Sequence, residues 1–162
     1  MDIKQAIALN FASADMLVDQ YLGDLTDEEL LVRPTPGANH IAWQLGHVIA
    51  AERYIGDKVA PGRMDELPAG FAERHKKNTA ASDSPADFLG KEDYLRIGRD
   101  VRANTLRIVE GWSPTDFDRP VDRVPPVVKT TGEAVLFIAA HWLMHAGQWA
   151  VVRRKLGRPP LF

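Results

Sequence analysis

The sequence predicts an all-α protein: a four-helix bundle with long crossover connections, forming one domain over residues 1–162. Three observations lead to this fold class. Apolar residues recur at spacings of three and four in four long segments, as in helices that bury one face. Helix-capping residues stand near the starts of several of these segments. Strand-like alternation does not persist anywhere, apart from the short Val127-Val128 pair.

The first helix is expected over residues 3–22. Its apolar stripe consists of Ile3, Ile7, Phe11, Ala14, Val18 and Tyr21. Thr26 and Glu29 then have the spacing of a capping box, which predicts a short helical piece. That piece should end before the turn that Pro34-Thr35-Pro36-Gly37 indicates.

The second helix should begin near Asn39, a favourable N-cap residue, and end near Val59. Residues 60–84 follow, with several prolines and glycines and no sustained periodicity. Unstructured loops of this length are uncommon in compact domains and are often functional. We therefore expect this segment to cover a site and to help select a substrate.

The third helix should run from Ser84-Pro85, a favourable start, to Trp112, and it could be broken near Gly90. Its stripe consists of Tyr94, Ile97, Val101, Thr105, Ile108 and Trp112. A proline-rich crossing over residues 113–129 follows.

The fourth helix is expected over about 132–156, after a second capping box formed by Thr130 and Glu133. Gly157 stands where a C-terminal cap belongs. Basic residues at positions 153–155 suit the negative end of the helix dipole. We expect them to form a solvated helix end rather than an anion site.

Composition argues against several kinds of partner and chemistry. The formal net charge is −2, so the chain has no general attraction for nucleic acid or anionic lipid. It contains no cysteine, which rules out disulfides, cysteine ligands and a cysteine nucleophile. The residues after Met1 lack the pattern of a signal peptide. We expect a cytoplasmic protein that does not bind nucleic acid.

The segment from Ala134 to Val152 lacks Asp, Glu, Lys and Arg, and is just long enough to span a bilayer. However, it includes His141, His145 and Gln148, which are costly to place in hydrocarbon. We expect a buried core helix and no membrane association.

Two of the five histidines, His141 and His145, are four residues apart on the fourth helix. This spacing places both imidazoles on one face, where they can bind one metal ion. The segment around them is apolar, and two buried neutral histidines need polar partners that a metal ion would supply.

The second helix offers a third ligand. His47 lies at the margin of the apolar stripe of that helix and should lean inward. His40 stands at the helix start and is expected to be a capping or surface residue, and His75 in the loop is expected to be exposed.

Glu52 falls within the apolar stripe of the second helix, where a carboxylate is unexpected. It could be a buried partner of an arginine, or a catalytic group near the metal ion that supports the ligands or acts as a base. Gln148 shares the stripe of His141 and His145 and is a second candidate for such a role.

Two motifs resemble those of the DinB-like (DinB/YfiT) superfamily. Asn39-His40-Ile41-Ala42-Trp43-Gln44-Leu45-Gly46-His47 is similar to the second-helix motif of that family. His141-Trp142-Leu143-Met144-His145-Ala146-Gly147-Gln148, with the basic, proline-containing segment 153–160, is similar to its fourth-helix signature. The resemblance extends over essentially the whole chain.

The resemblance implies a four-helix bundle with a three-histidine metal site, and His47, His141 and His145 match its ligands. Members with a known activity include bacterial thiol-dependent transferases and isomerases that use small thiols such as bacillithiol or mycothiol. The fold itself does not determine the reaction.

Three nitrogen ligands would leave an open position on the metal ion, as at catalytic sites. Zinc, nickel and ferrous iron all accept imidazole ligands. The favoured hypothesis is a metal-dependent enzyme that activates a thiol cosubstrate or water, as an S-transferase or a hydrolase acting on a small molecule. The alternatives are a non-catalytic protein that captures a small ligand through the metal ion, and a metal-free bundle with structural histidines.

The fourth helix is apolar nearly all round, which predicts burial on every side. The residues opposite the histidines are Leu136, Ala139, Leu143, Ala146 and Ala150. We expect this face to form a homodimer, the commonest soluble oligomer and one that the resemblance also implies. The alternative is a monomer in which residues 125–128 shield the face.

Overall fold

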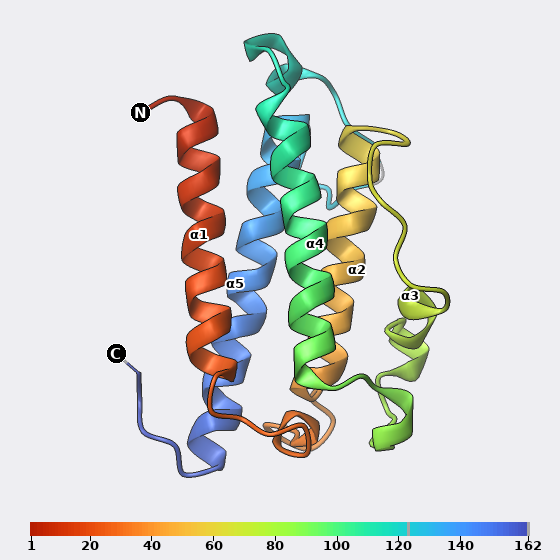
Figure 1. Cartoon of the computed structure of the whole chain (residues 1–162), viewed down its shortest axis with the longest axis vertical. Coiled ribbons are helices and arrows are strands. Elements are labelled where there is room, and N and C mark those ends of the chain that lie inside the picture. Colours follow the sequence, from red (N-terminus) through yellow and green to blue (C-terminus); the bar gives the residue numbers. More distant parts are fainter. Residues whose placement is uncertain (123, 162) are drawn as a thin grey trace.

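The computed structural model describes residues 1–122 and 124–161, and this part of the chain is helical with no strand (Figure 1). The expected all-α bundle is confirmed. Its four long helices are α1 (Ile3–Leu22), α2 (Ile41–Val59), α4 (Lys91–Glu110) and α5 (Thr131–Lys155). A single turn, α3 (Phe71–Arg74), lies in the connection between α2 and α4.

The helices form two pairs of opposite direction: α1 and α5 run one way, and α2 and α4 run the other way (Figure 1). Helix α5 packs against α1 and α2, and α4 packs against α2 and, more sparsely, against α1. Because α2 and α4 are parallel, residues 60–90 must return along the length of the bundle. The other two connections stay at the ends of the bundle.

The apolar stripes form the core, as the spacing predicts. All six residues of the stripe expected for the third helix are buried. In α1, Ile7, Phe11, Ala14 and Val18 are buried, whereas Ile3 at the helix start is exposed. Both capping boxes are confirmed, since Thr26 with Glu29 and Thr130 with Glu133 exchange two hydrogen bonds each.

Two helix starts differ from the expected ones. Helix α2 begins at Ile41 rather than near Asn39, because His40 is its N-cap and its Nδ1 accepts a hydrogen bond from the Trp43 amide. His40 is fully buried, so it caps the helix and is not a surface residue. The expected break near Gly90 is the actual start of α4, since Pro85–Asp87 forms a separate 3-10 turn.

The prediction that His75 is exposed is wrong. Its side chain is buried between α2 and α4, with Nδ1 2.8 Å from the Phe71 carbonyl oxygen and Nε2 2.7 Å from the Tyr94 hydroxyl. The ring occupies space left by Gly46, where an added Cβ would lie 2.2 Å from ring atoms. The connection between α2 and α4 is therefore held against the bundle by a buried side chain.

Two expectations for α5 also need correction. Arg153 is not solvated: it is buried, pairs with Asp24 and donates to the Tyr21 carbonyl oxygen, 2.8 Å away. Ala139 and Ala146 do not lie on an outer face, since both are buried in the bundle. This arrangement places α5 among the other helices even though it has the length and apolar composition of a membrane span.

The contact between Gly46 and His75 gives a testable prediction. The substitution Gly46→Ala should lower the free energy of unfolding by roughly 1–3 kcal/mol, because the methyl group overpacks a rigid ring. Gly98→Ala in α4 is the matched control, since its Cβ would meet neighbours at 3.5 Å. That change should raise the free energy of unfolding by roughly 0.5–1 kcal/mol. Urea denaturation in chelator would measure both, and equal effects would contradict the packing described here.

Candidate metal centre

Three histidine side chains from two helices meet between α2 and α5. Ligand nitrogens of His47, His141 and His145 all lie within 4.8 Å of one another. The Nε2 atoms of His141 and His145 are 3.2 Å apart. The ring centroid of His47 lies 5.2 Å from that of His141 and 5.4 Å from that of His145. The structure thus brings together all three residues that the sequence suggests as ligands.

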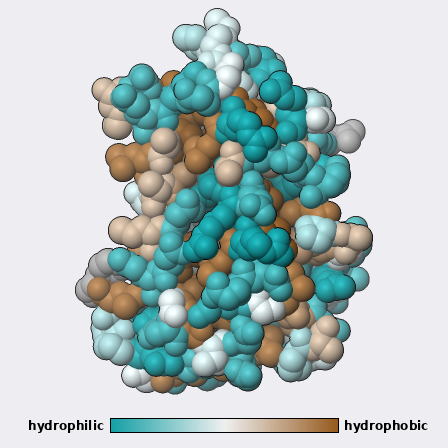
Figure 2. Space-filling view, in the orientation of Figure 1, coloured by the Kyte–Doolittle hydropathy of each residue, from teal (hydrophilic) through white to brown (hydrophobic). Residues whose placement is uncertain are grey.

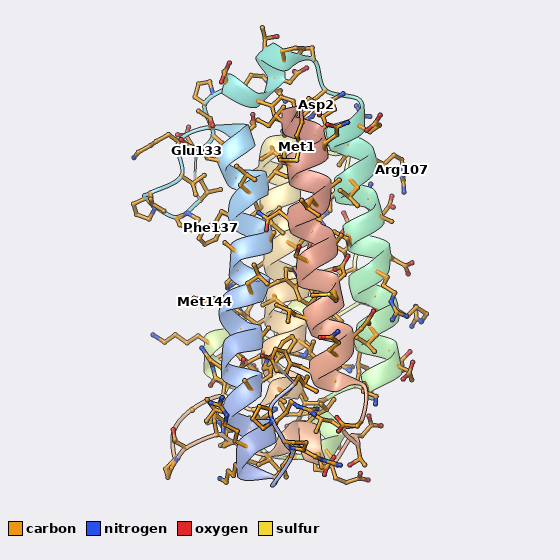
Figure 3. All side chains as sticks on the ribbon, turned by 90° about the vertical axis from the view of Figure 1, so that its left-hand side faces the viewer. Met1, Asp2, Arg107, Glu133, Phe137 and Met144 are labelled. Carbon is orange, nitrogen blue, oxygen red and sulfur yellow. The ribbon has the colours of Figure 1, made fainter. Side chains whose placement is uncertain are left out.

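Aromatic side chains one turn away hold two of the imidazoles in place. Trp43 stacks on His47 with ring centroids 5.0 Å apart and planes 8° apart. Phe137 stacks on His141 with centroids 5.8 Å apart and planes 20° apart. Figure 3 shows Phe137 projecting from the side of α5 that faces away from α1. His47 and His141 are half-buried while His145 is buried, so the cluster opens outward between α2 and α5.

Gln44 fixes the protonation of His145. Its Nε2 donates to the Asn39 carbonyl oxygen, 2.6 Å away, so its Oε1 must face α5. There Oε1 accepts from Trp149 Nε1 and lies 3.0 Å from His145 Nδ1. Because an amide oxygen only accepts, His145 must carry its proton on Nδ1 and present the lone pair of Nε2 to the cluster. Sequence reasoning did not identify Gln44.

Burial keeps the cluster uncharged. Burial, with a smaller contribution from the nearby histidines, lowers the pKa of His141 and of His145 to about 4. Burial also lowers the pKa of His47. The three imidazoles are therefore neutral near pH 7, which is the state that a metal ion requires of histidine ligands. The donor set fits a divalent ion that accepts imidazole, such as zinc, nickel or ferrous iron.

Glu52 lies in the core and belongs to a different set of contacts. Its two carboxylate oxygens accept from Arg102 Nε and Nη2, both at 2.9 Å, from Thr105 Oγ1 at 3.0 Å and from Trp142 Nε1 at 2.7 Å. Each oxygen accepts two hydrogen bonds, so the carboxylate has the geometry of a buried partner of an arginine. Gln148, the other candidate catalytic residue, is exposed on α5.

Comparison with known proteins agrees with this architecture. The family model of the DinB superfamily matches residues 10–149. No curated protein matches the chain. Among solved structures, a conserved protein from Enterococcus faecalis superposes with a TM-score of 0.69 at 15% sequence identity, covering 98% of this chain and 99% of that one. At this identity the likeness supports the fold alone.

The role of Gln44 predicts an effect on metal affinity. Gln44→Leu leaves the Nδ1 proton of His145 without an acceptor, and loss of such a partner weakens metal binding by roughly 10–100-fold. Gln44→Glu keeps an acceptor and should restore most of the affinity. Competition with a chromophoric zinc chelator would measure both. Gln148→Leu is the surface control. If the Gln44→Leu protein bound zinc as tightly as this control, Gln44 would have no role in orienting His145.

The buried histidines also predict a pH dependence of stability. Burial lowers the pKa of all five histidines from the usual 6.5. The unfolded chain therefore binds protons first as the pH falls below about 6.5, and the folded protein loses stability. In chelator, the free energy of unfolding should be lower at pH 5 than at pH 7.5. If the free energy of unfolding stayed constant or rose as the pH fell over this range, the buried imidazoles could not be neutral in the folded protein.

Proposed function

The chain belongs to the DinB superfamily, and on this basis we propose that it is a metal-dependent enzyme that activates a thiol cosubstrate or water at His47, His141 and His145. The observation that carries the proposal is the convergence of three neutral imidazoles on one point, with only three protein ligands among the described residues. A structural metal site would be closed by a fourth ligand.

A divalent ion held there would deprotonate a coordinated thiol outright, or lower the pKa of bound water to about 7. The protein's own contribution is orientation. Gln44 sets the tautomer of His145, while Trp43 and Phe137 limit rotation of the other two imidazoles. These side chains present nitrogen lone pairs toward one point.

The surroundings favour a thiol over water. Within the described residues, the group of potential ligands at this point contains histidines and no carboxylate. Glu52, the acidic residue of the neighbouring core, is fully engaged elsewhere and is not placed to remove a proton from attacking water. A thiol bound to a metal ion needs no such base. The chain has no cysteine, so the thiol must arrive with a small-molecule cosubstrate. This makes an S-transferase the favoured form of the proposal and a hydrolase the weaker form.

The segment after α2 is placed to respond to a substrate. The Trp43 indole, which stacks on His47, donates its Nε1–H to Thr79 Oγ1 at 3.1 Å. Movement of residues 71–84 would therefore shift the Trp43 indole and, with it, the position of the His47 ring. A cytoplasmic location, where small thiols are kept reduced, is part of this proposal.

A second candidate is a non-catalytic protein that captures a small ligand through the metal ion. The lack of a carboxylate among the potential ligands of the described residues supports it, because capture needs no proton transfer. Under this alternative a thiol would bind to the metal-loaded protein and be released unchanged.

The proposal predicts metal-dependent thioether formation. Protein loaded with zinc, nickel or ferrous iron, with metal content measured per chain, would be mixed with low-molecular-weight thiols and a chromogenic aryl halide. We expect a rate above the uncatalysed reaction that is lost in chelator and in His145→Ala, and kept in Gln148→Ala. Thiol-dependent stabilisation of the loaded protein without product would support the capture alternative. No metal uptake by the parent protein would reject both.

We also propose that α5 mediates a homodimer. The exposed or half-exposed apolar positions on one face of this helix are Leu136, Ala140, Leu143, Met144, Gly147 and Val151. In an antiparallel two-fold pair centred between positions 143 and 144, Ala140 would face Gly147 of the second copy, which permits close approach of the helices. Glu133 at one end of the face would then meet Arg154 of the second copy. The alternative is a monomer in which residues 125–128 shield this face, a segment in which Val128 is buried and Val127 is exposed.

The dimer is tested by light scattering at micromolar concentration. The parent should have twice the chain mass of 18.0 kDa. Met144→Glu places a charge on an exposed position, so it should give a folded monomer. Gln148→Glu, outside the face, should leave the mass unchanged. A parent mass near that of one chain would reject the dimer.

A further inference from the structure

A cavity lies between α1 and α4, away from the three histidines. Its volume is about 250 Å³, and the three histidines are not among its lining residues. Its apolar walls are formed by Val18, Leu45, Tyr94, Leu95, Gly98 and Trp142. Gly98 has no side chain to fill the space, and α1 and α4 pack sparsely here. Figure 2 shows the face that α1 and α4 turn toward the viewer, where hydrophobic surface is visible between hydrophilic side chains.

The polar lining consists of Asp15, Asp19, Arg99 and Arg102. Arg99 and Asp19 pair with each other at 3.0 Å in exposed positions, whereas the guanidinium of Arg102 is buried. Arg102 is 4% exposed, and its Nε and Nη2 bind the two oxygens of Glu52. A planar guanidinium bound in this way keeps a second pair of N–H groups, on Nη1 and Nη2, that can bind another carboxylate with two hydrogen bonds. Asp15 contacts only Nη1, at 2.5 Å. Within the described residues, the second N–H of Nη2 has no acceptor.

Asp15 reaches this position from a half-exposed place on α1. Its side chain is 51% exposed, although Arg102 is buried. Burial raises the pKa of Asp15 despite the adjacent guanidinium, and the negative charge of Glu52 adds to this effect. Rotation of Asp15 into solvent would uncover Arg102 from the cavity side while Glu52 stays in place.

We propose that this cavity binds a small monocarboxylate with a flat apolar body. The ligand's carboxylate takes the place of Asp15 on Nη1 and Nη2 of Arg102, and its ring lies against Gly98 and Trp142. Exchange of one carboxylate for another leaves the charge beside Arg102 unchanged. An apolar cavity of about 150 Å³ holds benzene, so 250 Å³ suits an aromatic ring with a carboxylate. The site is independent of the metal centre.

Benzoate is the probe, used with chelator-treated His141→Ala protein so that it cannot bind a metal ion. We expect saturable binding, with NMR shifts at the Arg102 Nε–H and the Trp142 Nε1–H, both of which donate to Glu52. Benzamide has the same shape without the charge and should bind about tenfold more weakly, because hydrogen bonds to a charged acceptor are the stronger ones. No saturable binding, or equal binding of benzamide, would overturn the proposal.

Two variants locate the ligand. Gly98→Leu fills the cavity and leaves Arg102 intact, so it should abolish binding. Asp15→Asn removes the competing carboxylate at a half-exposed position and should tighten binding. Benzoate that binds the parent only when zinc is present, or binds Asp15→Asn more weakly than the parent, would show that this cavity is not the site.

Discussion

The register between α2 and α5 is set by buried polar side chains that can be satisfied in one arrangement. Gln44 and Glu52 both lie on α2 and are fully or almost fully buried. Gln44 accepts from Trp149 and faces His145, and Glu52 accepts from Trp142, so each reaches α5. An unsatisfied buried polar group costs roughly 1–3 kcal/mol. A shift of one helix along the other would break all three contacts together, whereas apolar contacts would tolerate it.

This register places the histidine cluster on one side of α5 and the contacts of Trp142 on another. His141 and His145 face His47 and open outward between α2 and α5. Trp142, between them in sequence, points into the core and lines the cavity beside α4. Glu52 therefore acts structurally, because it holds Trp142 and Arg102 at once. Its pairing is not a large source of stability, although removal of either partner of a buried ion pair typically costs about 3–5 kcal/mol.

Our proposal of thiol rather than water activation depends on the same contacts. A carboxylate near the histidines would favour activation of water, and Glu52 is the only acidic residue in the buried face of α2. Its carboxylate is bound to Arg102 from α4 instead. The candidate metal site is thus surrounded by imidazoles, aromatic rings and one amide, and for this reason the proposed function assigns the nucleophile to the substrate.

The four long helices, two capping boxes and the three clustered histidines could be predicted from the amino-acid sequence, whereas the first residues of α2 and α4 could not. These features depend on residues within a few positions of one another, so the spacing of apolar residues, Thr130 with Glu133, and His141 with His145 could be recognised directly. The third histidine, His47, followed from the face of its own helix.

The polar contacts between different helices could not be predicted in this way. Gln44, His75 and Arg153 are buried through partners far along the chain, and the Glu52–Arg102 pair joins α2 to α4. These contacts appear only in the folded chain, because the rotation and register of one helix against another depend on packing over the whole bundle. For that reason the tertiary structure, rather than the sequence, separated the candidate metal centre from the buried carboxylate.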